Sequence, residues 1–471
     1  MIKLPSHYTH ILALAFPLIL SNLTVPLLGA VDTAVVGHLP DPAYIGGVAV
    51  GGTIFSFLFW GFGFLKMGTV GFTSQAFGAK NLPEQQASFL RPMLLALFFG
   101  FLLILLQGPL LQLCIHLIDG SAEVQQLALQ YSTIRIWSAP IALSNYVIIG
   151  WLIGKGEPKL TFILQVIINS VNILLDLIFV IQFEWGVEGV SLATVIAEVV
   201  GFAVGLWIIL KKSNFFSNKI DWQNIWLRSH ILALFTVNRD IFIRTLCLIF
   251  SFAYFTRLGA GMGNEILAAN AVLMHFLYFS AYGLDGFAHA AEITTGHAKG
   301  RNDNIEFKNA VKASSVMAFL TSIIFVAVFY LFGQLIVGLF TDIPSVQSTA
   351  SEFIYWPIIM PLLSVAGFQF DGIFIGTTRT ADLRNAMIQS LFIFLLSAWL
   401  FVPLWGNHGL WLAIAIYMAT RGLTLLRYYP GLLKSIRIKR KKSPHRESIR
   451  ICVNRREPIN IPAIISIKKQ P

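Results

Sequence analysis

Two carboxylates lie in stretches of the chain that are otherwise free of charge. Asp32 lies within the apolar run from Ile11 to Val36, and Asp176 lies within a second such run. A carboxylate on a membrane-spanning helix costs about 2.5 to 3.5 kcal/mol or more, so a chain that carries one usually moves ions or substrates past it. Asp32 and Asp176 are therefore candidate ion-coupling residues.

Helical spacing places further polar residues beside Asp176. Separations of 4, 3 and 4 put four of them on one face of a helix, namely Gln165, Asn169, Asn172 and Asp176. A polar face within lipid must meet protein or a water-filled cavity. Oxygen atoms of Asn172 or Thr194 near Asp176 would make its affinity for a proton depend on how open that cavity is. For Asn169 a structural hydrogen bond between helices is favoured over a direct role.

A second polar stripe lies in the other half of the chain. It follows helical spacing and consists of His275, Tyr278, Tyr282, Asp285, His289 and Glu292. Aromatic rings beside acids suit a cationic, amphipathic substrate. The predicted substrate-cavity residues are Asn145, Tyr282, Asp285, His289, Glu292 and Asp371. The alternative is that Asp285 and Glu292 neutralise Arg244 or Arg257. Neither histidine has the spacing of a metal site, and no metal is expected.

The elements that carry these residues are membrane spans. The chain is 56% hydrophobic and 12% charged, with a mean hydropathy of +0.71, whereas a soluble domain is about 25% charged. Apolar runs long enough to cross a bilayer recur along the sequence. The predicted spans are roughly 10–36, 48–74, 90–115, 128–153, 160–182, 187–211, 235–258, 266–296, 311–338, 351–376, 384–405 and 409–430.

Basic residues fall in alternate connections between these spans. Connections on one side carry Lys80, Lys155, Lys211, Arg301 and Arg379, whereas those on the other side contain no Lys or Arg. Short cytoplasmic loops carry the Lys and Arg excess, so both termini are predicted to be cytoplasmic. Most of the formal net charge of +11 belongs to residues 434–471, which hold twelve Lys or Arg and two Glu. That tail can contact anionic membrane lipids, and no nucleic-acid partner is expected.

The sequence repeats itself at an offset of 222 residues. The offset pairs identical residues at seven positions, among them Gly78 with Gly300, Gly150 with Gly372, and Gly154 with Gly376. We predict an all-α polytopic membrane protein with twelve transmembrane helices in two pseudo-symmetric lobes of six helices each. The predicted domains are an N-lobe at 1–212, a C-lobe at 213–433 and a disordered basic tail at 434–471. Parallel repeats of this kind build transporters with a central cavity.

Several sequence segments resemble one transporter family. In the first half these are VDTAVVGHL from Val31, GEPK from Gly156, NILLD from Asn172 and GVEGVSLATVIAE from Gly186. In the second half they are NRDIFIRTL from Asn238, LAANAVL from Leu267, YGLDGFAHAAE from Tyr282 and DGIFIGTTRTADLRNAM from Asp371. Together they resemble the multidrug and toxic compound extrusion (MATE) transporters, DinF-like branch, over about residues 5–430.

The resemblance implies an antiporter that exports cationic or amphipathic drugs in exchange for protons or sodium ions. It makes Asp32 the coupling acid and places the cation or proton site at Asp176, Asn172 and Thr194. Pro17 and Pro26 become candidates for a bend in the first helix. Two features depart from the family pattern: the basic tail, and His289 at a position where an apolar residue is expected.

Alternative functions come from other classes. A flippase for a lipid-linked precursor belongs to the same superfamily, but its pyrophosphate headgroup would require a more cationic cavity. An intramembrane enzyme is disfavoured because neither HExxH nor GxSxG occurs, so no enzymatic activity is expected. Cys114, Cys247 and Cys452 indicate neither disulfides nor a metal site. Of the two coupling ions, protons are the prediction, with sodium possible; no other cofactor is expected. We expect a monomer in the bacterial inner membrane.

Overall fold

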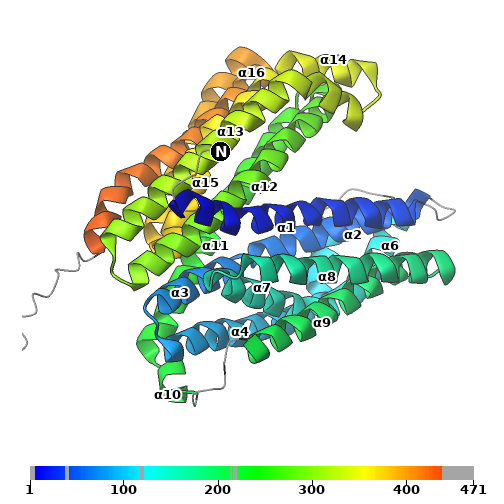
Figure 1. The fold of residues 1–471 in the computed structure, drawn as a ribbon. Helices are drawn as coiled ribbons and strands as arrows, with labels where there is room; N and C mark the ends of the chain where they lie inside the picture. Colours follow the sequence, from blue (N-terminus) through cyan, green and yellow to red (C-terminus); the bar gives the residue numbers. More distant parts are fainter. Residues whose placement is uncertain (1–5, 38–41, 117–120, 213–214, 216–219, 437–471) are drawn as a thin grey trace, which may run out of the picture. The chain divides into compact units, whose positions relative to one another are not determined.

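The computed structural model describes residues 6–37, 42–116, 121–212, 215 and 220–436, which form helices joined by short turns (Figure 1). No strand occurs within these ranges. The first half contains α1 (Ser6–Val36), α2 (Pro42–Gly61), α3 (Phe64–Gly78), α4 (Leu82–Leu105), α5 (Gln107–His116), α6 (Ala122–Arg135), the 3-10 turn η1 (Ile136–Ser138), α7 (Ala139–Gly154), α8 (Pro158–Asp176), the π-helical η2 (Leu177–Gln182) and α9 (Gly186–Lys212). The second half contains α10 (Trp222–Ile225), α11 (Arg228–Ala260), α12 (Asn264–Gly300), α13 (Asn304–Phe340), α14 (Pro344–Phe353), α15 (Tyr355–Gly376) and α16 (Thr380–Ser435).

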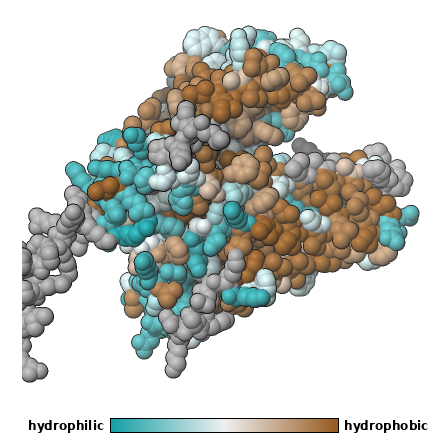
Figure 2. Space-filling model, in the orientation of Figure 1, coloured by the Kyte–Doolittle hydropathy of each residue, from teal (hydrophilic) through white to brown (hydrophobic). Residues whose placement is uncertain are grey.

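Ten of the described helical segments are long and apolar enough to cross a membrane. The 31-residue α1 and the division of α16 into two helices at Gly406 bring the spans to the predicted twelve. Apolar side chains cover wide areas of both helical groups, as Figure 2 shows. Within a bilayer such surfaces face lipid, and helices satisfy their own backbone hydrogen bonds. The prediction of an all-α polytopic membrane protein is confirmed.

The helices form two groups, α1–α9 and α11–α16, each with its own apolar core. The first core runs through the sequence from Val35 to Ile241 and so also includes the first part of α11, and the second runs from Cys247 to Met418. Helix α1 belongs to the first group but contacts both, because it packs on α8 of the first group and on α12 of the second (Figure 1). A smaller cluster, with Leu14 of α1 and Leu284 of α12, joins them. The proposed domain limits at 212/213 and 433/434 stay predictions, and most of the tail lies outside the described residues.

The repeat is visible in the backbone of equivalent turns. Lys80 and Asn302, which the offset of 222 pairs, both have positive φ, 55° and 53°. Gly156 and Thr378 form a second such pair, at 81° and 51°. Non-glycine residues with positive φ are uncommon, so shared positive values at paired positions indicate that the two groups turn in the same way. These four turns meet at one end of the molecule, which we call the basic end after its Lys80, Lys155, Lys299, Arg301 and Arg379.

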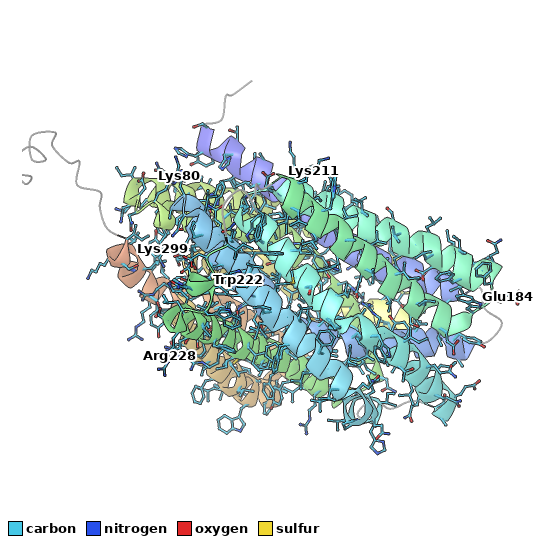
Figure 3. All side chains as sticks on the ribbon, turned by 90° about the horizontal axis from the view of Figure 1, so that it is seen from below. Lys80, Glu184, Lys211, Trp222, Arg228 and Lys299 are labelled. Carbon is cyan, nitrogen blue, oxygen red and sulfur yellow. The ribbon has the colours of Figure 1, made fainter. Side chains whose placement is uncertain are left out.

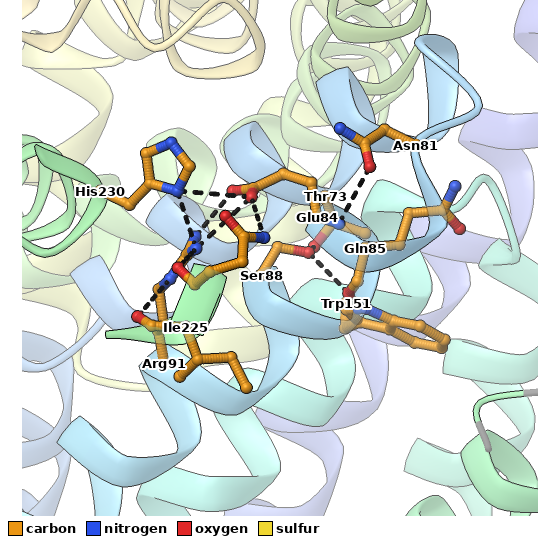
Figure 4. A network of polar contacts seen from close by, with 10 residues as sticks. Thr73, Asn81, Glu84, Gln85, Ser88, Arg91, Trp151, Ile225 and His230 are labelled. Atoms are coloured by element: carbon orange, nitrogen blue, oxygen red, sulfur yellow. Dashed lines mark hydrogen bonds and ion pairs between the residues drawn. The ribbon is translucent and has the colours of Figure 1, made fainter. Parts of the chain in front are cut away.

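The connection between the two groups is held to α4 by a polar network (Figure 4). Arg91 of α4 pairs with Glu84 at 2.7 Å and donates to the carbonyl oxygens of Asn224 and Ile225 at 2.8 and 3.1 Å. Its Nη2 also lies 2.9 Å from His230 Nδ1. Arg91 itself is buried, whereas the side chains of Glu84 and His230 are partly exposed. The network fixes where α10 ends and α11 begins.

Gly406 provides a test of this architecture. It has φ 54° and ψ −128° between the two parts of α16, and no atom lies within 4 Å of the position that a Cβ would occupy. An alanine at this position would therefore introduce backbone strain but no steric clash. We expect Gly406→Ala to lower the free energy of unfolding by about 1–3 kcal/mol. The measurement is the thermal unfolding midpoint of the purified protein in detergent.

Gly338→Ala is the matched control. Gly338 lies within α13, and a Cβ there also meets nothing within 4 Å. Alanine is the better helix former, so that variant should unfold at or above the wild-type midpoint. Equal midpoints for both variants would show that the backbone at Gly406 is not strained by a side chain.

Candidate functional site

The carboxyl groups of Asp32 and Asp176 face each other where α1 packs on α8, and they interact directly. Asp176 is the last residue of α8, before the π-helical turn η2, and its side chain is fully buried. Asp32 is half-buried on α1. The structure thus brings together two acids that lie 144 residues apart in the sequence.

The polar face of α8 meets α1 and α9. Gln165 donates to Asn169 at 3.0 Å, and Asn169 donates to the carbonyl oxygen of Thr24 in α1 at 3.4 Å. Asn172 Nδ2 donates to Thr194 Oγ1 of α9 at 3.3 Å. Helical spacing predicted this shared face, and Asn169 makes the structural hydrogen bond between helices that is favoured for it above. Asn172 and Thr194 therefore lie together on the α8–α9 contact.

Several buried oxygens near this contact have no donor among the described residues. They are Asp32 Oδ1, Asn172 Oδ1 and both carboxylate oxygens of Asp176. A buried acceptor without a partner costs about 1–3 kcal/mol, and two carboxylates side by side also repel each other. A proton on one acid would supply a donor and remove the repulsion, and a small cation would do the same through its charge. The arrangement can therefore bind either species.

A cavity of about 700 Å³ adjoins these acids. Asp32, Asn145 and Thr194 line it, as do Arg135 and Glu198. Arg135 pairs with Glu198 at 2.7 Å and lies over the rings of Phe55 and Phe59 at 5.7 and 5.6 Å. Of the charged residues in the wall, Arg135 is balanced by Glu198, so Asp32 leaves the cavity with net negative charge when it is ionised. Its wall also carries aromatic rings.

The predicted substrate residues of the second half do not line this cavity. Tyr282, Asp285, His289 and Glu292 all lie on α12, outside the wall. His289 Nδ1 lies 2.8 Å from Glu292 Oε2. Lys66 of α3 is an electrostatic neighbour of both Asp285 and Glu292. These α12 residues face the other helical group, where a lysine is set against two acids.

Asp371 forms ion pairs with two arginines. It lies on α15 and pairs through Oδ2 with Arg244 of α11 and with Arg421 of α16, the latter at 2.7 Å. All three side chains are buried. Arg244 thus has Asp371 as its ion-pair partner, and Asp285 is a further electrostatic neighbour. The alternative interpretation above assigns the neutralisation of Arg244 to Asp285 and Glu292. The structure places Asp371 in a structural ion pair, away from the cavity.

Lys66 is the functional candidate that sequence reasoning missed. It is the one charged residue in the apolar span predicted at 48–74, and that isolation was its signal. Its acidic neighbours lie more than 200 residues away and come from the other helical group. No pattern of spacing within one span could have paired them.

Two other predictions concern the helix bend and metals. Helix α1 is assigned as one continuous helix through Pro17 and Pro26, so the bend stays a prediction. In the part of the chain that the structure describes, no group of three or more His, Cys, Asp or Glu side chains could hold a metal ion.

The fold and the cavity define a polytopic membrane protein built from a repeated group of helices around buried acids. The MatE family model matches residues 17–178 and 241–400, one segment in each half. The chain belongs to the MatE family, whose members are transporters and not enzymes.

Known relatives agree with this assignment. The chain is 42% identical to the DNA damage-inducible protein F of Escherichia coli (strain K12) over 412 residues, which covers 88% of this chain and 90% of that protein. It is 20% identical to the multidrug export protein MepA of Staphylococcus saprophyticus, over 80% of this chain and 82% of that protein. A solved structure described as MATE in the bent conformation superposes with a TM-score of 0.81 at 19% identity, covering 92% of this chain and 99% of that chain. At that identity the likeness shows the fold.

The unequal halves generate a prediction about which acid couples transport. The offset replaces Asp32 by Tyr254 and Asp176 by Ala398, so the acid pair exists in the first group only. We expect Asp176→Asn to abolish ion-driven transport of every dye, because the pair can no longer bind and release its ion. Asp285 does not line the described cavity, so Asp285→Asn should leave ion coupling intact and lower the transport of only some cationic dyes, by about tenfold. Uptake of several dyes into inverted vesicles measures both.

Asp240→Asn serves as the control for loss of a buried acid, because Asp240 pairs with Arg239 and Arg384 at the basic end. A general loss in Asp285→Asn together with normal coupling in Asp176→Asn would move the coupling site to the second group.

Proposed function

We propose that this protein is a secondary antiporter that exports cationic or amphipathic compounds in exchange for protons, with Asp32 and Asp176 as the coupling acids. One observation carries the proposal: Asp32, in the wall of a large cavity, interacts directly with the buried Asp176 behind it, and Asp32 Oδ1 and both carboxylate oxygens of Asp176 lack donors among the described residues. The multidrug export relative supports drug-like substrates.

Competition for the same negative charge would couple the two fluxes. In a cavity of low dielectric, a bound organic cation is stabilised when Asp32 is ionised and loses that stabilisation when a proton or small cation occupies the acid pair. Substrate and ion then exclude each other from one site. Alternation of the site between the two sides of the membrane turns that exclusion into exchange.

The charge of the cavity also supports cationic substrates over the phosphorylated lipid of the alternative flippase. The one cation in the described wall, Arg135, is paired with Glu198, and Asp32 adds a negative charge. A pyrophosphate headgroup would meet repulsion there. The rings of Phe55 and Phe59, and of Tyr131 and Tyr146, offer faces for cation–π contacts with an organic cation.

The basic end supports an orientation for this exchange. Lys80, Lys299 and Arg228 are labelled toward one end in Figure 3, whereas Glu184 lies at the opposite end. Under the positive-inside rule that basic end is cytoplasmic, and both termini lie on that side of a bacterial inner membrane. A monomer suffices, because one chain carries both the cavity and the acid pair.

The central test replaces one acid by its isosteric amide. Asp32→Asn keeps the shape of the side chain but cannot bind a proton, so we expect it to abolish resistance to ethidium-like cations while expression and membrane insertion stay normal. Resistance of cells that carry the variant is the measurement. Wild-type resistance in Asp32→Asn cells would remove Asp32 from the coupling mechanism.

The coupling ion needs a separate test, because Asn172 and Thr194 supply oxygens that a sodium ion can also use. We expect dye transport in inverted vesicles to follow an imposed pH gradient and to ignore an imposed sodium gradient. The Asp32→Asn vesicles should respond to neither gradient. Wild-type transport that follows sodium and ignores pH would replace the proton by sodium at the same acids.

A further inference from the structure

A second cavity, of about 480 Å³, lies at the basic end between turns from both helical groups. Its described wall contains three basic side chains and no acidic one. Lys80 lies in the turn between α3 and α4, Lys155 follows α7, and Arg301 follows α12. His297 of α12 and Phe77 of α3 complete the part of the wall considered below. Figure 3 labels Lys80 at this end of the helices.

The three cations are incompletely neutralised by the protein. Lys155 Nζ lies 4.6 Å from the centre of the Trp151 ring and 5.9 Å from that of Phe77, and it makes no ion pair with a carboxylate of the described residues. Burial lowers the pKa of Lys155, and nearby Glu157 opposes that shift only in part. Lys80 likewise has no recorded ion pair within the described ranges. Arg301 pairs at 2.5 Å with Glu306 through Nη2, which leaves its other nitrogens available.

The cavity lies beside a reciprocal seam between the two helical groups. Gln75 of α3 donates from Nε2 to the carbonyl oxygen of Gly376 at 3.0 Å, and His297 donates from Nε2 to the carbonyl oxygen of Gly154 at 2.9 Å. The offset of 222 converts the first bond into the second. The two donors occupy equivalent positions, and so do the two acceptors.

Glycines bring the backbones together at the same seam. A Cβ on Gly78 would lie 2.2 Å from the carbonyl oxygen of His297, and one on Gly300 would lie 2.1 Å from that of Gln75. The offset also relates these two contacts. Such distances leave no room for any side chain, so α3 and α12 are locked in close contact at the basic end. His297 belongs both to this seam and to the wall of the cavity.

We propose that this cavity is a binding site for a phosphate-bearing anion, either an anionic lipid headgroup or free phosphate. The ligand would contact Lys80 and Lys155 of the first helical group and Arg301 of the second. Guanidinium groups bind phosphate through paired hydrogen bonds, and ammonium groups bind it as point charges. Because its contacts come from both groups, the bound anion holds the seam closed.

Anion binding at this cavity is independent of the proposed export activity. It requires neither a particular substrate nor a particular coupling ion, and it is measured by ligand binding and by protection of backbone amides. If transport fails in every assay, the anion site can still be found. If the anion site is absent, the acid pair in the other cavity is unaffected.

Binding is tested on the purified full-length protein in nanodiscs of zwitterionic lipid. The probes are inorganic phosphate and a short-chain phosphatidic acid, with a short-chain phosphatidylcholine for comparison. The variant Lys80→Gln/Lys155→Gln/Arg301→Gln removes the three cations. With about 1 kcal/mol for each basic residue, its affinity for phosphatidic acid should fall roughly 100-fold.

The matched control is Arg228→Gln/Lys308→Gln/Lys312→Gln, which removes the same charge from exposed positions outside the cavity. It should bind within about twofold of wild type, since screening weakens distant surface charges. Single Lys80→Gln, in an exposed turn, provides a milder test if the triple variant unfolds. The proposed site would be refuted if both triple variants lost the same affinity for phosphatidic acid, or if the cavity variant lost none.

The probes also separate the two sources of phosphate. If both inorganic phosphate and phosphatidic acid bind, and the cavity variant loses both, the site accepts a phosphate group of headgroup size. Binding of phosphatidic acid alone supports a lipid as the ligand. Binding of inorganic phosphate alone supports a soluble anion as the ligand. Binding of phosphatidylcholine as tight as that of phosphatidic acid would contradict an anion site.

Hydrogen exchange tests whether the ligand closes the seam. The amides of Ala79, Lys80 and Asn81 and of Arg301, Asn302 and Asp303 lie in the two equivalent turns, each hydrogen-bonded to a backbone carbonyl. The tighter-binding probe should slow exchange at 76–83 and 297–304 in wild type and leave both segments unchanged in the cavity variant. Binding without protection on both sides of the seam would refute the closure.

Discussion

The contact between two carboxyl groups in the interior of a membrane protein is the constraint on which the rest of this structure depends. Asp32 and Asp176 repel each other when both are ionised, and neither oxygen of Asp176 has a donor among the described residues. A proton or small cation on one acid would remove this repulsion, which is the basis of the coupling role proposed for the pair. Asp32 lines the adjoining cavity, and Asp176 lies on the polar face of α8.

Other acids in the membrane-spanning helices differ from this pair because they form ion pairs with arginines. Asp371 is enclosed by Arg244 and Arg421, and Glu198 is paired with Arg135. Breaking such a buried pair costs about 3–5 kcal/mol, so these groups act as fixed connections between helices. Lys66, set against Asp285 and Glu292, balances charge between the two helical groups. The contrast separates structural ion pairs from the acids that remain available.

The sequence repeat corresponds to symmetric contacts between the two helical groups at the basic end. The bond from Gln75 to Gly376 and the bond from His297 to Gly154 are related by the offset of 222 residues, as are the close contacts of Gly78 and Gly300. Glycines that matched in the sequence therefore match because each allows one group to approach the backbone of the other. The repeat explains the seam, and the seam explains why glycine is needed at those positions.

The sequence by itself determined the membrane class, the twelve spans, the repeat and the polar face of α8, because each depends on hydropathy or on the spacing of residues within one helix. It also singled out Asp32 and Asp176 as costly charges. Only the tertiary structure decided that these two acids meet, that Asp371 lies between two arginines and that Lys66 faces α12. Those pairings join residues 50 or more positions apart in the sequence. They depend on which helix faces pack together, which the spacing within one span cannot specify.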